Sequence, residues 1–306
     1  MYWENKRYNA LGLYLKNKFN KQIIKLSLDA GFTCPNRDGT LSTEGCIYCS
    51  PLGSGDFAAS RRLDLYTQLE QQMVLLKNKW PNGKYIAYFQ NYTNTYAPIN
   101  ELTSLYNKAI SHPNVIGLAI ATRPDCLPDE TIDLLSKLNK KTFLWVELGL
   151  QTIHEHTAQL INRQYSLKVF EEALGKLKQH QIKTVVHLIF GLPFESKKDM
   201  LDSVHYLSSK DIFGIKLHLL HVLKHTKLAK MYQLDQFSTL KKEAYISLIV
   251  DALEILHPEI TIHRLTGDAP WKHLVAPKWS TDKRGILNGI DAELKRRKSW
   301  QGIKFL

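Results

Sequence analysis

Three of the four cysteines in the 306-residue chain, Cys34, Cys46 and Cys49, lie in one short segment. Four thiolates complete a tetrahedral zinc site or a fully protein-ligated iron-sulfur cluster, whereas three leave one iron of a [4Fe-4S] cluster open to another ligand. An open iron can take part in a reaction. The number of clustered cysteines therefore makes them candidate metal ligands at a site of chemistry.

The rest of the sequence indicates a reducing compartment for these thiols. No apolar run approaches the roughly 18 residues that span a membrane, and residues 1–7 lack the apolar segment of a secretory signal. We therefore expect a cytoplasmic protein with no membrane segment, in which clustered cysteines bind metal rather than form disulfides. The isolated Cys126 is expected to be a structural thiol.

Lysine and arginine (41) outnumber aspartate and glutamate (29), which gives a formal net charge of +12. A surplus of this size favours polyanionic partners, because each neutralised phosphate releases counterions. Nucleic acid is the natural candidate. A basic surface with no such partner is the alternative that charge alone leaves open.

Short β-rich runs alternate with amphipathic helical runs along most of the chain. Such alternation requires parallel strands joined by right-handed crossovers, which gives either an open doubly wound sheet or a curved, barrel-like one. The sequence thus predicts an α/β fold with a six-fold βα repeat. The predicted strands span residues 23–28, 85–90, 115–121, 143–150, 184–190 and 214–221, and the predicted helices 63–80, 100–111, 129–138, 167–180 and 196–209.

In both folds, ligands bind at the carboxyl ends of the strands. The cysteine segment directly follows the first predicted strand, and polar or glycine-rich segments at 90–95, 122–125 and 191–195 follow three others. Gly149 and Gln151 lie at the end of the fourth strand. We therefore expect all of these segments to share one rim of the sheet.

After the repeat the pattern changes to a helix at 240–256, a strand at 260–265 and a basic helix at 282–298. No low-complexity linker separates this part from the repeat. We therefore expect two parts, a core of residues 1–223 and an extension of residues 224–306 that packs on the open edge of the sheet.

The chain resembles the radical S-adenosylmethionine (SAM) superfamily, in which a three-cysteine loop follows the first strand and an aromatic residue precedes the last cysteine. The gaps of eleven and then two residues between the cysteines differ from the superfamily's commonest spacing. They are similar to a wide-spaced subgroup that includes the elongator-type tRNA modifiers and, over nearly the whole chain, the YhcC/YtqA type. The similar segments are residues 34–49, 89–95, 122–125, 147–151, 162–163 and 191–193.

This resemblance implies a partial (β/α)6 radical SAM barrel with a C-terminal α/β extension. It also implies that Cys34, Cys46 and Cys49 hold a [4Fe-4S] cluster whose open iron binds the amine and carboxylate of SAM. Electron transfer into SAM then gives a 5′-deoxyadenosyl radical. A ferredoxin or flavodoxin is the expected electron donor.

Eight residues are expected to bind SAM on this resemblance: Tyr48, Gln90, Thr93, Asn94, Thr122, Gln151, Arg163 and His187. Tyr48 would lie near the adenine, and oxygens after the second strand would accept hydrogen bonds from the SAM amine. Gln151 would contact the ribose, and the Arg163 guanidinium suits the carboxylate. Thr122 or His187 would hold the ribose hydroxyls. Ordinary packing, an Asn- and Thr-rich turn, a surface arginine and a core histidine are the structural alternatives.

Substrate contacts are expected in the widened cysteine loop and in the polar, aromatic segment 263–273, since flipped RNA bases are held by stacking and polar groups. The two tryptophans of this region, Trp271 and Trp279, could equally be core residues that fasten the extension. The candidate contact residues are Asn36, Arg37, Asp38, Arg264, Asp268, Trp271 and Lys272.

Enzymes of the YhcC/YtqA type resemble tRNA-modifying enzymes that act on the carbon-5 side chain of a wobble uridine. The resemblance implies removal of the carboxymethyl group from 5-carboxymethylaminomethyl(-2-thio)uridine, which leaves the 5-aminomethyl form. Two alternatives remain open from the sequence. One is a radical SAM enzyme that acts on a small metabolite or protein, and the other is a zinc-dependent RNA-binding module with Cys126 or a histidine as fourth ligand.

Overall fold

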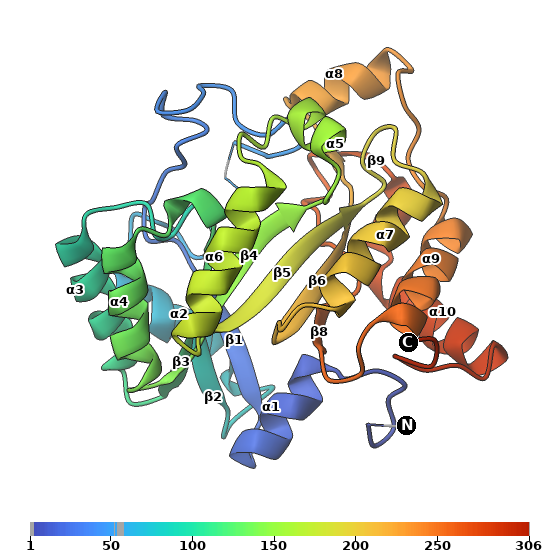
Figure 1. The fold of residues 1–306 in the computed structure, drawn as a ribbon. Coiled ribbons are helices and arrows are strands. Elements are labelled where there is room, and N and C mark those ends of the chain that lie inside the picture. The colour runs from blue at the N-terminus through green and yellow to red at the C-terminus, as the bar shows by residue number, and fades with distance from the viewer. Residues whose placement is uncertain (1–2, 52, 54–57, 306) are drawn as a thin grey trace.

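Seven strands form one parallel sheet whose spatial order follows the chain, β1-β2-β3-β4-β5-β6-β8. The computed structural model describes residues 3–51, 53 and 58–305. The sheet curves into a half-barrel (Figure 1), so the predicted α/β fold with a partial barrel is confirmed. Its strands are β1 (Ile23–Leu28), β2 (Lys84–Phe89), β3 (Val115–Thr122), β4 (Phe143–Gln151), β5 (Lys183–Phe190), β6 (Gly214–Leu219) and β8 (Thr261–Arg264).

Helices cover the outer, convex face of the sheet (Figure 1). Two of these helices begin with side-chain caps. The Asp64 carboxylate accepts hydrogen bonds from backbone N–H groups at the start of α2. Ser196 forms a capping box with Asp199 at the start of α7. The covering helices are α2 (Leu65–Lys77), α3 (Ile99–Ile110), α4 (Asp129–Asn139), α6 (Leu167–Gln179), α7 (Lys197–Ser208) and α9 (Lys242–Ile255). No helix among the described residues is long and apolar enough to cross a membrane.

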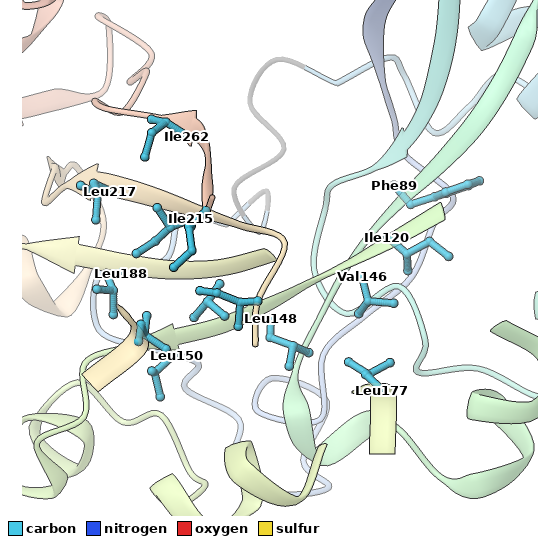
Figure 2. Packing of buried hydrophobic residues seen from close by; sticks show 14 of the residues in the cluster. Phe89, Ile120, Val146, Leu148, Leu150, Leu177, Leu188, Ile215, Leu217 and Ile262 are labelled. Carbon is cyan, nitrogen blue, oxygen red and sulfur yellow. The ribbon is translucent and has the colours of Figure 1, made fainter. Parts of the chain in front are cut away.

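The main core lies between the sheet and these helices. On β4, Val146, Leu148 and Leu150 are fully buried and face outward, and Leu177 of α6 belongs to the same cluster (Figure 2). Removing a side chain of this size from water contributes about 1.5–3 kcal/mol. Two of the alternate residues of β4, Trp145 and Glu147, face the inside of the half-barrel and are fully buried as well.

A helix at the chain's start, α1 (Leu11–Phe19), fills the N-terminal end of the half-barrel (Figure 1). Its Leu11 and Leu15 belong to the inner apolar cluster that includes Trp145. Just before α1, Ala10 pairs with Ile262 in an isolated parallel bridge. The inside of the barrel is therefore packed at this end and open only at the carboxyl ends of the strands.

Both ends of the chain meet beside this closed end. The backbone N–H of Asn9 donates to the Gln301 side chain at 2.9 Å, and the N–H of Gln301 donates to the carbonyl of Arg7 at 2.9 Å. The Gln301 amide also donates to the carbonyls of His257 and Ile260, each at 2.8 Å. Gln301 is thus fully buried and links the N-terminal segment to the region of strand β8.

The predicted strand at 260–265 becomes β8, the seventh strand of the sheet, so the C-terminal part extends the sheet at its open edge. The proposed division at residue 223 stays a prediction. The remaining elements are η1 (Pro124–Cys126), α5 (Glu155–Leu160), the antiparallel pair β7 (Val222–Leu223) and β9 (Leu274–Ala276), α8 (Lys227–Gln233), η2 (Lys278–Thr281) and α10 (Lys283–Arg296).

Candidate active site

A cavity of about 470 Å³ opens at the carboxyl ends of the strands, where ligands bind in folds of this type. Its lining includes all three clustered cysteines, Cys34, Cys46 and Cys49. The structure thus brings the cysteine loop and the strand ends together as the sequence predicted. The other predicted site residues that line the cavity are Arg37, Tyr48, Gln90, Thr93, Thr122, Gln151, Arg163, His187, Arg264 and Asp268.

The cysteine loop is held in shape by two of its own polar side chains. The Asn36 amide donates to the carbonyl of Asn162 at 2.6 Å, and it lies 3.6 Å from the Cys46 sulfur. The Arg37 guanidinium donates to the carbonyls of Cys49 and Ser50 at 2.9 and 2.8 Å. Asn36 is fully buried outside the cavity lining, so the structure places it as a brace of the loop.

Gly45, directly before the second cysteine, has a conformation that the loop requires. Its φ is +70°, and a Cβ there would lie 2.9 Å from the Arg37 side chain. Its N–H also donates to the carbonyl of Asn36 at 2.6 Å. A larger residue would therefore displace the arginine that orients Cys49, because the left-handed region strains other side chains.

The donor set suits a cluster better than a single zinc ion. A zinc ion needs sulfur ligands at about 2.3 Å, which places them less than 5 Å apart. Among the residues that the structure describes, only His154, Asp199 and Asp202 bring three candidate ligand atoms within 4.8 Å of one another. The three cysteine sulfurs are spaced more widely, and the buried Cys126 does not line the cavity.

Burial raises the pKa of the Cys46 thiol to about 11, and the neighbouring Cys49 adds to this rise. Because metal binding requires the thiolate, a bound cluster would release protons from this loop. Tyr48 lies between the two cysteines, lines the cavity and is held neutral, since burial raises its pKa well above the usual range. Burial therefore favours the neutral forms of Cys46 and Tyr48 before a metal binds.

Arg163 is the most deeply buried cation of the cavity wall, with 1% of its surface exposed. Its Nε and Nη1 atoms donate to the carbonyls of Tyr165, Leu150 and Thr152 at 2.7–3.0 Å. Its Nη2 atom has no hydrogen-bond partner among the described residues and lies 3.6 Å from Glu155. A buried guanidinium with a free donor suits the SAM carboxylate.

Gln151 lies at an irregularity at the end of β4, where the register shifts after Gly149. Its φ is +69°, which is uncommon for a residue with a side chain. Strained backbone of this kind gathers at binding sites, because the surrounding structure must hold it in place. The bulge positions Gln151 in the cavity lining.

Of the four predicted polar residues after β2 and β3, three line the cavity and one does not. Thr93 is buried in the cavity lining, and its hydroxyl has no hydrogen-bond partner among the described residues. Gln90 accepts from Ser27 at 3.0 Å, and Thr122 bonds to Thr95. Asn94 instead lies outside the lining, where its amide donates to the carbonyls of Phe89 and Ala121 at 3.1 and 2.8 Å.

A buried polar network crosses the inside of the half-barrel beneath the cavity, with Glu147 at its centre. Tyr88 and His187 lie 2.8 and 2.9 Å from its Oε2 atom, and Lys216 donates to the same oxygen. Trp145 donates to Oε1 at 2.9 Å, and Lys25 lies 4.0 Å from it.

The charges of this network favour ionised Glu147 and neutral His187. Burial alone would raise the pKa of Glu147, but Lys216, Lys25 and His187 lower it well below its usual range. Burial lowers the pKa of His187 to about 4, and Lys216 adds to that effect. His187, predicted to contact the ribose or to be a core histidine, therefore lies in the cavity wall and in the buried network at once.

Sequence reasoning missed several residues of the cavity wall. Arg123 donates to both oxygens of Asp125 at 2.9 and 2.7 Å, and its guanidinium lies 4.9 Å from the Tyr165 ring centre. Arg123 belongs to the segment 122–125, in which the sequence predicted only Thr122 as a site residue. The other missed polar residues of the lining include Tyr88, Glu147, Lys216, His218 and His221.

Besides Asn36, three predicted substrate contacts lie outside the cavity lining. Asp38 accepts from the N–H of Thr40 in an exposed turn. Trp271 is 72% exposed, and Lys272 lies 5.7 Å from its ring centre. Trp279, by contrast, packs against the main core and donates to the carbonyl of Leu240 at 3.0 Å.

The radical SAM superfamily model matches residues 36–207, and the radical SAM C-terminal domain model matches residues 212–296. The chain is 46% identical to the YtqA protein of Bacillus subtilis over 300 residues, which cover 98% of this chain and 93% of that protein. It is 34% identical to YhcC of Escherichia coli over 279 residues, which cover 91% and 89%. The chain therefore belongs to the radical SAM superfamily.

Two more distant similarities concern the elongator type. A tRNA uridine(34) acetyltransferase of Methanocaldococcus infernus is 27% identical over 169 residues, which cover 54% of this chain and 30% of that protein. The structure of an archaeal Elp3 from the same organism aligns with a TM-score of 0.68 at 18% identity, and covers 91% of this chain and 64% of that one. This chain therefore spans less than two thirds of that structure's length, and the likeness shows a shared fold.

This protein is a radical SAM enzyme related to YtqA and YhcC. Membership of the superfamily implies a [4Fe-4S] cluster and SAM. The buried free donor of Arg163, the unpartnered Thr93 hydroxyl and the three cysteines fit these two groups in one cavity.

Proposed function

We propose that the protein modifies tRNA at the wobble uridine, where it removes the carboxymethyl group from 5-carboxymethylaminomethyl(-2-thio)uridine and leaves the 5-aminomethyl form. The observation that carries this proposal is a single cavity in which the cysteine loop faces a row of cationic side chains on β6 and β8. That arrangement suits a radical reaction on a substrate with an anionic side chain. The distant similarity to a tRNA uridine(34) acetyltransferase supports the same base as the target.

In this proposal Cys34, Cys46 and Cys49 hold the cluster, and Arg163 binds the SAM carboxylate. Thr93 and Gln90 accept hydrogen bonds from the SAM amine, and Gln151 contacts the ribose. When bound, these cofactors would supply a 5′-deoxyadenosyl radical, which takes up a hydrogen atom from the carboxymethyl carbon next to nitrogen. A one-electron acceptor such as the oxidised cluster would then convert that carbon radical, with loss of a proton, to an imine. Addition of water to the imine would break the C–N bond, release the two-carbon group as glyoxylate and leave the 5-aminomethyl amine. The apolar and neutral wall around Tyr48 excludes water from the radical step.

The mouth of the cavity has side chains that suit a nucleic acid. Tyr92 lines the cavity, and the guanidinium groups of Arg37 and Arg61 lie 5.8 and 5.5 Å from its ring centre. An aromatic ring flanked by two arginines can stack on a base while the cations lie near phosphates. The net charge of +12 favours the same partner.

The test is anaerobic reconstitution with iron and sulfide, followed by reaction with SAM, dithionite and tRNA from a strain that lacks this gene. We expect 5′-deoxyadenosine to rise with tRNA and the wobble nucleoside to lose the mass of its carboxymethyl group. Deoxyadenosine formation with an unchanged wobble nucleoside would contradict the proposal and favour a small metabolite or protein substrate. A ferredoxin or flavodoxin should replace dithionite as electron donor.

A further inference from the structure

Three polar side chains form one row across neighbouring strands inside the half-barrel. In the sheet register, His187 of β5 pairs with Lys216 of β6, and Lys216 pairs with Arg264 of β8. All three residues line the cavity. Since residues in one row of a parallel sheet point to the same side, Lys216 and Arg264 present two adjacent cations to the cavity.

The one carboxylate of the buried network is already fully used. Glu147 receives hydrogen bonds from Tyr88, Lys216, His187 and Trp145, and Lys25 lies close to it. Two lysines therefore share a single buried acid. Burial lowers the pKa of Lys216 well below its usual range, and Lys25 and Arg264 add to this effect against the opposing influence of Glu147. Around Glu147, the cationic side chains of Lys25, Lys216 and Arg264 therefore outnumber the one buried carboxylate.

Arg264 keeps most of its donors available. It forms an ion pair with Asp268 at 3.2 Å, and no hydrogen bond from it to another described residue is present. Asp268 is in turn shared with Lys283, whose amine donates to both carboxylate oxygens at 2.7 and 2.8 Å. The guanidinium of Arg264 can therefore bind a second carboxylate without losing its only neutralising partner.

Two histidines of the same wall also have unpartnered atoms. The Nε2 atoms of His218 and His221 are buried and have no hydrogen-bond partner among the described residues. Both residues line the cavity, and His218 follows Lys216 by two residues on β6. Buried polar atoms without partners are rare in native proteins, and they are explained when a ligand supplies the missing partner.

We propose that Lys216 and Arg264 bind the carboxylate of the substrate's side chain and so select wobble uridines that carry the carboxymethyl group. This inference rests on the proposed function and names the residues that read the anionic end of that side chain. The two cations come from adjacent strands, so they can grip both oxygens of one carboxylate. A carboxylate on SAM is the other source of this chemistry, and the experiment separates the two.

The experiment uses the reconstituted enzyme with the Arg264→Gln variant. We expect the KM for tRNA that carries the 5-carboxymethylaminomethyl group to rise at least about tenfold, since charge-assisted hydrogen bonds are the strong ones. The dissociation constant for SAM should stay unchanged. Inhibition by product tRNA with the 5-aminomethyl group should also stay unchanged, because the product has no carboxylate. Arg264→Lys should recover part of the lost affinity.

Two further variants keep the test sharp. Arg284→Gln makes the same change at an exposed arginine that does not line the cavity, so it should leave all three constants near their wild-type values. Lys216 is 2% exposed, and its removal alone would leave the buried Glu147 with only the more distant Lys25, at 4.0 Å, as a lysine partner. The double variant Lys216→Met with Glu147→Gln therefore replaces the pair, and its KM should rise as for Arg264→Gln.

Three outcomes would overturn the inference. An unchanged KM for substrate tRNA in both variants means that the carboxylate binds elsewhere. Weaker SAM binding with an unchanged KM assigns the cations to the SAM carboxylate. Equal weakening of substrate and product tRNA makes Arg264 a contact to the tRNA backbone. If the wild-type enzyme converts no wobble nucleoside at all, the proposed function fails first, and the substrate named here fails with it.

Discussion

Lys216 on β6 donates a hydrogen bond to the Tyr88 hydroxyl on β2 at 2.8 Å, across the inside of the half-barrel. The two strands are not neighbours in the sheet, so the bond spans the concave face. Both side chains also contact the same oxygen of Glu147. A single buried triangle thus links opposite parts of the sheet beneath the cavity.

Loss of the Tyr88 hydroxyl should destabilise the protein. In Tyr88→Phe, Glu147 and Lys216 each lose a buried partner, which costs about 1–3 kcal/mol of the free energy of unfolding. Urea unfolding of the metal-free protein at neutral pH measures this change. Tyr206→Phe removes an exposed hydroxyl bonded to Glu171 and should cost less than about 1 kcal/mol. Equal effects of the two changes would contradict a special role for the buried triangle.

Mild acid should destabilise the folded state through its buried histidines. Burial lowers the pKa of His187 and of His221 to about 4, whereas an unfolded histidine titrates near 6.5. Between those values the unfolded chain binds more protons, so stability falls as the pH falls from about 6.5 to 4. Each histidine accounts for up to about 3 kcal/mol of this loss.

The measurement for this prediction is the free energy of unfolding of the metal-free protein from pH 7.5 to pH 4.5. His187→Asn and His221→Asn should each flatten the curve in that window. His205→Asn, at an exposed position on α7, should keep the full slope. A curve that both buried variants leave unchanged would assign the acid sensitivity to carboxylates instead.

Each cysteine of the loop should be required for the cluster. Each single alanine variant should lose most of the iron and sulfide that the reconstituted wild type retains: Cys34→Ala, Cys46→Ala and Cys49→Ala. The reason is that all three thiolates are needed to hold a [4Fe-4S] cluster with one open iron. Cys126→Ala should keep full iron content and cost about 1 kcal/mol of stability for the small cavity that it leaves. Iron loss in Cys126→Ala, or zinc in place of iron, would contradict this prediction and favour a zinc site in which Cys126 is the fourth ligand.

Replacement of Arg163 should weaken SAM binding. Arg163→Lys keeps the charge but loses the planar group whose free Nη2 atom we assign to the SAM carboxylate, so the dissociation constant should rise about tenfold or more. The exposed Arg62→Lys is the matched control. Because Arg163 also holds three backbone carbonyls, thermal unfolding is measured in parallel. An unchanged dissociation constant in a folded variant would refute this assignment.

The sequence predicted the six repeat strands because their apolar runs are short, β-rich and separated by amphipathic helices. It could not assign a face to each residue of β4, since Trp145 and Val146 are both fully buried on opposite sides. Helix α1 was missed because its N-cap residue, Ala10, has no side chain that could cap it, and because the helix follows no strand. Its role depends on packing against Trp145, a residue far away in the chain.

The candidate site was predicted where chemistry depends on residue type and missed where it depends on long-range contact. Cysteine spacing was enough to identify the loop. Thr93 and Asn94 are neighbours of similar polarity, yet only Thr93 lines the cavity, because the strand end turns Asn94 toward backbone carbonyls. Lys216 looked like one of many lysines, since its partners Tyr88 and Glu147 lie on other strands.

The hydrogen bonds between Gln301 and residues 7–9 have a consequence for the order in which the protein folds during synthesis. Residues 7–9 precede every strand of the sheet, but their partner Gln301 lies 292 residues after Asn9. The cysteine loop and the six repeat strands therefore exist before the floor of the barrel is closed. A nascent chain should therefore remain open and aggregation-prone until Gln301 has left the ribosome, so a cofactor inserted before that point would enter an unfinished barrel.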